Sequence, residues 1–168
     1  MKARVIAAHG RQYLVELEDG QRVLAFPRGK KSEVACGDHV QISRASADQM
    51  VIERVETRRS LLYRSNEIRQ KLIAANVDQL VIVVATEPGF SDELVTRALV
   101  AAESQDIRSL IVLNKCDLTD RLPQARQQLA VFAAQGYPIL EICAREHAEA
   151  LRPHLLNRTS VLVGQSGM

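Results

Sequence analysis

The amino-acid sequence predicts two architectures in series, a small β-barrel followed by a parallel sheet flanked by helices. Between residues 3 and 55, short apolar and β-branched runs are separated by turn-forming residues, with no helical pattern between most of them. From about residue 76, continuous apolar runs alternate with amphipathic stretches of helical period, which is the pattern of a doubly wound α/β sheet. We therefore predict a barrel at residues 1–60, a linker at 61–75 and an α/β domain at 76–168.

The barrel is predicted from short runs that alternate apolar and polar residues, most clearly at residues 13–18 and 40–43. This alternation is expected of half-buried antiparallel strands. An OB-fold is the common five-stranded closed barrel, and many OB-folds bind nucleic acid. The number of strands alone leaves an SH3-like barrel as the alternative. The five predicted strands are Ala3–Ala8, Tyr13–Leu17, Arg22–Phe26, His39–Arg44 and Met50–Val55.

The α/β domain is predicted to begin with the apolar run Leu80–Ala85, typical of a strand covered on both faces. Ser91 is expected to cap the helix that follows, with acidic residues in its first turn. The joining stretch Leu61–Ala75 is expected to contain some helix. The later predicted elements are a strand at Leu110–Leu113, a helix from Pro123 to Gln135, a strand at Ile139–Cys143, a short helix at about Glu146–Leu156 and a strand at Ser160–Val163.

The composition excludes several classes of protein. Apolar residues make up 46% of the chain and charged residues 25%, which excludes a disordered or fibrous chain. No apolar run approaches the ~20 residues of a membrane span, and the N-terminus lacks the features of a signal peptide. The cysteines at positions 36, 116 and 143 fit neither a disulfide framework nor a zinc pair. We expect a cytoplasmic monomer with no metal site in this chain.

The charge is distributed unevenly along the chain. Residues 1–70 hold 13 Lys and Arg against 9 Asp and Glu, an excess of four positive charges, whereas the whole chain has a net charge of +2. Basic residues concentrated in one half indicate a polyanion partner, with a solvated charged surface as the equally weighted alternative. The candidate RNA-binding residues are Arg28, Lys30, Lys31, Arg54, Arg58, Arg59 and Arg64.

The stretch Asn114-Lys115-Cys116-Asp117 follows a buried strand, where an α/β protein binds its ligand. An ionised Asp carboxylate accepts hydrogen bonds from both N1–H and the 2-amino group of guanine, and adenine offers no such pair of donors. The Asn amide is expected to reach the O6/N7 edge, with the Lys stem lying along the base. A polar loop before a helix is the alternative. We predict that Asn114, Lys115 and Asp117 bind guanine.

Two later stretches complete the candidate site. One β-α step further on, Cys143, Ala144 and Arg145 occupy the place of the Ser-Ala-Lys loop that flanks the base in guanine-nucleotide folds. The last residues follow a buried run in the way that a phosphate-binding loop, GxxxxGK[ST], begins. Because this order places the base-reading motif before the phosphate loop, it indicates a circular permutation. The candidate phosphate-binding residues are Gly164, Gln165, Ser166, Gly167 and Met168.

In this order of motifs the chain resembles the circularly permuted GTPases, and among them the bacterial group that depends on the small ribosomal subunit. The resemblance covers essentially the whole chain, and the stretch Ala75–Gln79 is its most specific part. It implies an OB domain, a permuted G domain and a C-terminal domain that binds Zn²⁺. It also implies GTP and GDP as ligands with Mg²⁺, hydrolysis stimulated by the 30S subunit with its 16S rRNA, and action late in the maturation of that subunit. The other matching stretches are Gly37–Val40, Leu113–Leu118 and Val163–Gly167.

The chain departs from this family by ending inside the phosphate-loop motif. It lacks the Lys and Ser/Thr of GxxxxGK[ST] and the switch segments that hold Mg²⁺, so the catalytic residues are expected beyond Met168. We expect these 168 residues to be an N-terminal fragment that is inactive as a GTPase. The alternative is a non-catalytic RNA-binding module, a basic barrel fused to a degenerate nucleotide-binding domain.

Overall fold

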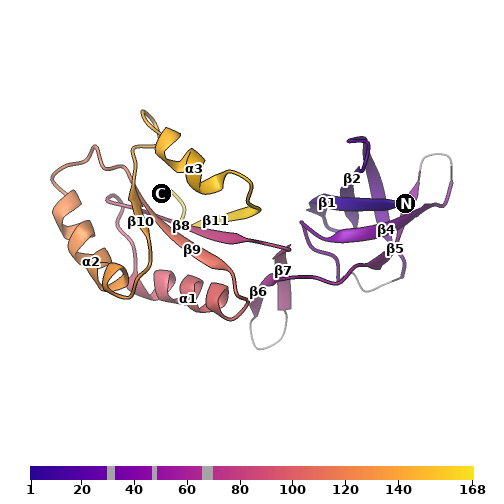
Figure 1. Ribbon diagram of the computed structural model, residues 1–168, viewed down its shortest axis with the longest axis horizontal. Coiled ribbons are helices and arrows are strands. Elements are labelled where there is room, and N and C mark those ends of the chain that lie inside the picture. Colours follow the sequence, from indigo (N-terminus) through magenta and orange to yellow (C-terminus); the bar gives the residue numbers. More distant parts are fainter. Residues whose placement is uncertain (30–32, 47–48, 66–69) are drawn as a thin grey trace. The chain divides into compact units, whose positions relative to one another are not determined.

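The computed structural model describes residues 1–29, 33–46, 49–65 and 70–168. The predictions for Lys30 and Lys31 lie outside the described residues. The chain divides into two compact units, Met1–Val77 and Asp78–Met168 (Figure 1).

The first unit contains a closed five-stranded barrel with the strand order β1-β2-β3-β5-β4. All of its neighbouring strands are antiparallel except β3 and β5, which are parallel. Alternate side chains from each strand point inward and form its core, in which Val15, Ala25 and Val40 have no exposed surface. The predicted OB-like barrel is therefore confirmed. Its strands are β1 (Lys2–His9), β2 (Gln12–Leu17), β3 (Arg22–Pro27), β4 (His39–Arg44) and β5 (Met50–Val55).

A two-stranded antiparallel hairpin follows the barrel, formed by β6 (Leu61–Ser65) and β7 (Gln70–Ala75). The predicted helix in this stretch is wrong for its described residues. Burial alternates along the strands, since Leu62 and Ala74 are buried while Tyr63 and Ile73 are exposed. Such a period of two favours strands over a helix. An isolated bridge from Cys36 to Ala74 joins the hairpin to the segment before β4.

Asn76 fastens the end of the hairpin to the barrel. It adopts a positive φ of 56°, and its buried side chain accepts a hydrogen bond from the Arg59 backbone N–H at 2.9 Å. Its amide also donates to the Gly37 carbonyl at 3.0 Å, while the Ala75 N–H donates to the Cys36 carbonyl at 2.8 Å. These bonds satisfy buried polar groups on both segments, so the hairpin and the barrel pack as one unit.

We expect Gly37→Ala to destabilise this unit by roughly 2–3 kcal/mol. Gly37 has a φ of 92°, and a Cβ at this position would overlap the Ala75 carbonyl oxygen. Gly20→Ala is a matched control, because Gly20 has a φ of 82° but open space around it. Hydrogen exchange of barrel amides would measure the stability of both variants. Equal losses of stability would show that the close approach of Gly37 to Ala75 adds no cost to the substitution.

A buried ion pair closes the same region. Asp38 has no exposed surface, and its carboxylate accepts hydrogen bonds from Arg58 Nε at 2.7 Å and Arg58 Nη2 at 2.8 Å. It also accepts one from the Ala35 N–H at 2.7 Å. The hydrogen bond to Asp38 raises the pKa of Arg58, against the opposing effect of burial. Arg58 is therefore a structural residue of the barrel.

The second unit is a four-stranded parallel sheet in the order β10-β9-β8-β11. Helices α1 and α2 cover one face and α3 covers the other, so the predicted α/β layering is confirmed (Figure 1). No helix among the described residues is both long and apolar enough to span a membrane. The elements are β8 (Gln79–Ala85), α1 (Asp92–Glu103), β9 (Arg108–Asn114), α2 (Leu122–Ala134), β10 (Ile139–Glu141), a 3-10 turn at Glu149–Leu151, α3 (Arg152–Leu155) and β11 (Ser160–Gly164).

Three local predictions differ from the structure. β10 ends at Glu141, because Cys143 pairs with His147 and turns the chain away from the sheet. The predicted helix at residues 146–156 is shortened to one 3-10 turn and α3, whose first turn accommodates Pro153. Ser91 occupies the N-cap position of α1 but makes no side-chain capping hydrogen bond.

Candidate nucleotide-binding site

The carboxyl ends of the parallel strands bring three separate stretches of the sequence together. They surround a cavity of about 560 Å³, which we call the carboxyl-end cavity. Gly164, Gln165 and Ser166 do not line it, although Gly167 and Met168 do. The binding roles of these residues stay predictions, but their convergence is a feature of the structure. The cavity is lined by Asn114, Lys115, Asp117, Leu118, Cys143, Ala144, Arg145, Gly167 and Met168.

Asn114 connects the two loops that were predicted to hold the base. Its side-chain Oδ1 accepts a hydrogen bond from the Ala144 backbone N–H at 3.0 Å. The amide oxygen is thus used within the protein, and the predicted contact with the O6/N7 edge of guanine, whose atoms are acceptors, would be made by the amide NH₂ group. Asn114 therefore positions the Cys143–Arg145 loop beside Asp117.

Lys115 connects the loop that follows β9 to the last residues of the chain, which were predicted to begin a phosphate loop. Its backbone has a positive φ of 59°, and its Nζ donates hydrogen bonds to the carbonyl oxygens of Glu87, at 2.8 Å, and of Gly167. The Thr86 hydroxyl donates to the Lys115 carbonyl at 2.9 Å. Thr86 and Glu87 were not predicted as site residues. Both residues directly follow β8, the strand that pairs with β9, and this position could have indicated them as site residues.

Asp117 and Cys143 interact across the carboxyl-end cavity. A hydrogen bond with Asp117, together with burial, raises the pKa of the Cys143 thiol. Cys143 therefore stays protonated at neutral pH and serves as a donor to the carboxylate, as the hydroxyl of a serine would. Cys116, the variable position of the motif, instead donates to the Leu113 carbonyl at 3.2 Å.

Glycine at position 164 is required by the packing of the sheet. β11 pairs with β8 so that Gly164 lies opposite Val83, and a Cβ on Gly164 would lie 2.6 Å from the Val83 carbonyl oxygen. A larger residue would push the start of the phosphate loop away from the neighbouring strand. This close approach explains the glycine that opens the motif.

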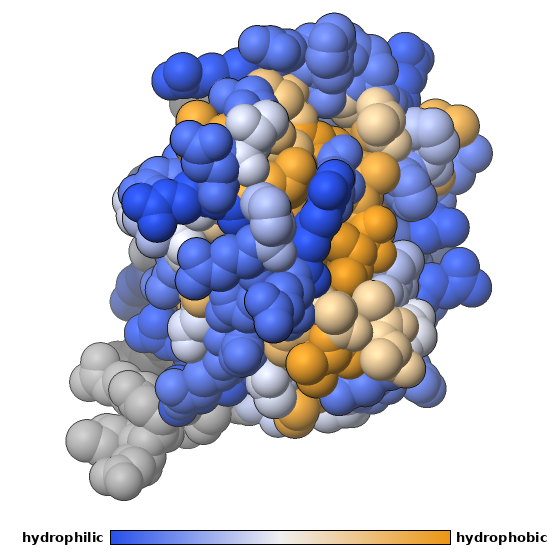
Figure 2. Space-filling model, turned by 90° about the vertical axis from the view of Figure 1, so that its left-hand side faces the viewer, coloured by the Kyte–Doolittle hydropathy of each residue, from blue (hydrophilic) through white to orange (hydrophobic). Residues whose placement is uncertain are grey.

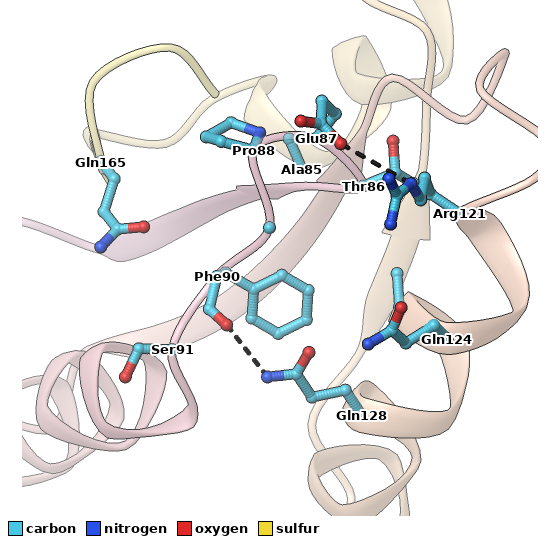
Figure 3. Close-up of a pocket in the computed structure, with 12 residues that line it drawn as sticks. Ala85, Thr86, Glu87, Pro88, Phe90, Ser91, Arg121, Gln124, Gln128 and Gln165 are labelled. Carbon is cyan, nitrogen blue, oxygen red and sulfur yellow. Dashed lines mark hydrogen bonds and ion pairs between the residues drawn. The ribbon is translucent and has the colours of Figure 1, made fainter.

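A second cavity of about 430 Å³ lies next to the phosphate loop and is lined in part by Gln165 (Figure 3). It lies between the loop that follows β8 and helix α2. Gln128 of α2 donates to the Phe90 carbonyl at 3.0 Å, and Arg121 lies 3.8 Å from the Glu87 carboxylate. These contacts hold the loop after β8 against α2, beside the residues that begin the phosphate loop.

One side of the molecule and the carboxyl-end cavity both present hydrophobic surface. Figure 2 shows the side of the molecule on which α2 lies, where hydrophilic residues border a band of hydrophobic ones. Leu118 is 39% exposed and lines the carboxyl-end cavity, so it offers an apolar surface beside Asp117. A cavity with apolar walls and a few convergent polar groups is the usual form of a small-molecule site.

The candidate RNA-binding arginines differ in their surroundings. Arg28 is exposed and forms an ion pair with Glu53 at 2.6 Å, and Arg58 is committed to Asp38. Arg59 donates to the Asn76 carbonyl at 3.5 Å. Arg54 and Arg64 are exposed to solvent. Among the described arginines of the candidate set, these two are the best placed to contact a polyanion.

The fold and this cavity together define a circularly permuted GTPase domain that follows an OB-like barrel in the sequence. The predicted base-reading loop follows β9, whereas β11, the strand that leads to the predicted phosphate loop, comes later in the chain. Residues 55–168 match the family described as RsgA GTPase. The chain belongs to the RsgA GTPase family.

Relatives and solved structures agree with this assignment. The chain is 54% identical to the small ribosomal subunit biogenesis GTPase RsgA of Paraburkholderia xenovorans, covering 98% of this chain and 54% of the relative. It is 52% identical to the protein of the same name from Ralstonia pickettii, covering 98% and 53%. The chain therefore spans about half the length of these relatives.

Two crystal structures share the fold. YjeQ from Thermotoga maritima superposes with a TM-score of 0.74 at 30% identity, covering 99% of this chain and 60% of that one. YloQ, described as a circularly permuted GTPase, has a TM-score of 0.69 at 26% identity, with the same coverage. The permuted order predicted from the motifs is confirmed.

Proposed function

We propose that this chain is the RNA-binding and base-reading part of a GTPase that acts in the biogenesis of the small ribosomal subunit. The carboxyl-end cavity carries the proposal, because it brings Asp117, Lys115 and Asn114 against the Ala144 and Gly167 loops. The names of the relatives support the ribosomal role. We place its action in the cytoplasm, as a monomer, on the 30S subunit.

Each residue of the cavity has a distinct task in reading guanine. The Asp117 carboxylate accepts hydrogen bonds from N1–H and the 2-amino group, and the Cys143 thiol holds that carboxylate in place. The Lys115 stem lies along one face of the base while its Nζ holds Gly167. Leu118 shields the hydrogen bonds from water, which makes an unmatched base costly.

The phosphate groups are assigned to the loop that begins at Gly164. Its backbone N–H groups and the Ser166 hydroxyl are suitable donors to phosphate oxygens. We propose that Mg²⁺ accompanies the nucleotide and neutralises charge on its phosphates. The described residues contain no group of three His, Cys, Asp or Glu that could hold a metal, so none of them is assigned to Mg²⁺ or to Zn²⁺.

The barrel and the hairpin are proposed to bind the 16S rRNA. Arg54 lies on β5 and Arg64 on β6, and both are exposed. Because such cations release counterions from the phosphates that they neutralise, binding should weaken as salt rises.

In the full-length protein, 30S subunits are expected to stimulate GTP hydrolysis, and replacing both Arg54 and Arg64 with Ala is expected to reduce that stimulation. The basal rate should not change, because neither residue lines the carboxyl-end cavity. The plot of log affinity against log salt should flatten by about two units, roughly one for each lost phosphate contact. Phosphate release and co-sedimentation with 30S subunits at several salt concentrations measure these effects.

Replacing Arg97 and Arg152 with Ala is the matched control, because it removes the same charge from exposed positions on α1 and α3. A full-length protein that 30S subunits fail to stimulate would refute the proposed GTPase function. Stimulation with an unchanged salt dependence in the Arg54 and Arg64 variant would instead refute the RNA-binding role of these two arginines.

A further inference from the structure

A third cavity, of about 410 Å³, lies at the opposite end of the sheet from the carboxyl-end cavity. We call it the amino-end cavity. β10 begins at Ile139, opposite Ile111, so residues 108–110 of β9 extend beyond the start of the neighbouring strand. Ile111 donates its N–H to Pro138 on that side. Because every second residue of a parallel strand faces the same neighbour, the Ser109 backbone also faces this side, where β10 has not yet begun.

Ser109 carries a polar group without a partner in this cavity. Its Oγ is buried and has no hydrogen bond with any described residue. A buried hydroxyl without a partner costs free energy, and native structures leave few such groups unless a ligand or water meets them. Ser109 lines the amino-end cavity, but its Oγ has almost no accessible surface, so a molecule in the cavity meets this hydroxyl only when the Ser109 side chain turns toward the cavity.

Basic side chains from two elements line the same cavity. Arg108 is exposed and forms no ion pair within the described part of the chain. The Arg158 guanidinium donates to the buried Gln79 side chain at 2.7 Å, and Gln79 in turn donates to the His154 carbonyl at 3.1 Å. A guanidinium held in this way loses little further freedom when it binds an anion.

Acidic groups do not cancel this charge. Glu103 is the one carboxylate that lines the amino-end cavity among the residues that the structure describes, and it accepts a hydrogen bond from the Tyr137 hydroxyl at 3.3 Å. Two arginines therefore face one carboxylate that already has a partner.

We propose that the amino-end cavity binds a phosphate group, with Arg108 and Arg158 as its charged donors and with the Ser109 hydroxyl as a further donor once the Ser109 side chain has turned toward the cavity. Arginine forks match the geometry of phosphate oxygens, and charge-assisted hydrogen bonds of this kind are stronger than neutral ones. The volume suits a phosphate monoester or one phosphate of an RNA backbone. This site is separate from the nucleotide site and does not depend on the proposed function.

The test uses the isotopically labelled chain, with inorganic pyrophosphate as one probe and a short single-stranded RNA as the other. With GDP present, each probe is expected to shift the amide signals of Ser109 and Arg158. Arg108→Ala should weaken binding by at least about tenfold. Ser109→Ala should also weaken it, while leaving the melting temperature of the free chain unchanged or higher, because it removes a hydroxyl without a partner.

Arg97→Ala removes an equal charge outside the cavity and should leave the amide shifts at Ser109 unchanged. Binding of pyrophosphate and RNA alike would assign the site to free phosphate esters as well as RNA, and binding of RNA alone would assign it to RNA phosphates. The proposal is overturned if neither probe shifts Ser109, or if Arg108→Ala binds as tightly as the unaltered chain.

Discussion

Asp117→Asn is expected to convert a guanine preference into a xanthine preference in the full-length protein. The carboxylate offers only acceptors, which suit the N1–H and 2-amino donors of guanine. An Asn amide presents its NH₂ group to the 2-amino group, so one hydrogen bond is lost and two donors face each other. Xanthine carries a carbonyl at C2, which accepts from the same amide. The expected loss in GTP binding is on the order of 3–5 kcal/mol.

Calorimetric titration of GTP and XTP into both proteins measures this change. Cys143→Ser is the matched control, because it alters the neighbour of Asp117 but keeps a donor to its carboxylate. It should retain the guanine preference. A folded Asp117→Asn variant that still prefers GTP would show that Asp117 does not read the base.

Arg58→Ala is expected to destabilise the first unit by about 3–5 kcal/mol, because it leaves the fully buried Asp38 carboxylate without its counterion. The loss should appear as faster hydrogen exchange at barrel amides such as those of Val5 and Val40. Arg54→Ala removes the same charge from the exposed side of β5 and should change stability by less than about 0.5 kcal/mol.

The double variant Asp38→Ala with Arg58→Ala separates the ion pair from simple packing. Removing both charges should recover part of the stability that Arg58→Ala loses, since no buried charge is left alone. If the double variant is instead less stable than Arg58→Ala, by as much as Asp38→Ala alone destabilises the protein, the unpaired carboxylate is not the cause of the loss in Arg58→Ala.

Local patterns were sufficient to predict the strands of the barrel and of the parallel sheet. The bounds of β4 and β5 agree with the prediction, because alternation and flanking turns mark a barrel strand within its own residues. The hairpin β6–β7 was missed, since its buried face exists only where Ala74 meets the segment at Cys36. The contact that favours a strand over a helix is made here with a segment that lies far away in the sequence, so the local pattern of residues 61–75 did not indicate it.

The candidate site shows the same division. The loop at residues 114–117 was predicted to lie at a ligand site because its residue types suit guanine chemistry, and the later stretches that share the cavity followed from their order. The contacts of Lys115 with Glu87 and Gly167 depend on backbone carbonyls, which carry no sequence signature. The sequence did not show that Arg58 is paired within the protein while Arg54 is exposed. The partner of Arg58 is Asp38, which lies 20 residues earlier in the chain.

The pairing of β11 with β8 has a consequence for the nascent chain. Ser160 lies opposite Gln79, 81 residues earlier, whereas β8, β9 and β10 are neighbours both in sequence and in the sheet. Contacts of long sequence separation form late, because closing a long loop costs entropy before the contact forms. We therefore expect the growing polypeptide to assemble β8, β9 and β10, with the loops at Asp117 and Ala144, before β11 is added. During translation, the loops proposed to bind guanine thus form before the loop proposed to bind the phosphates.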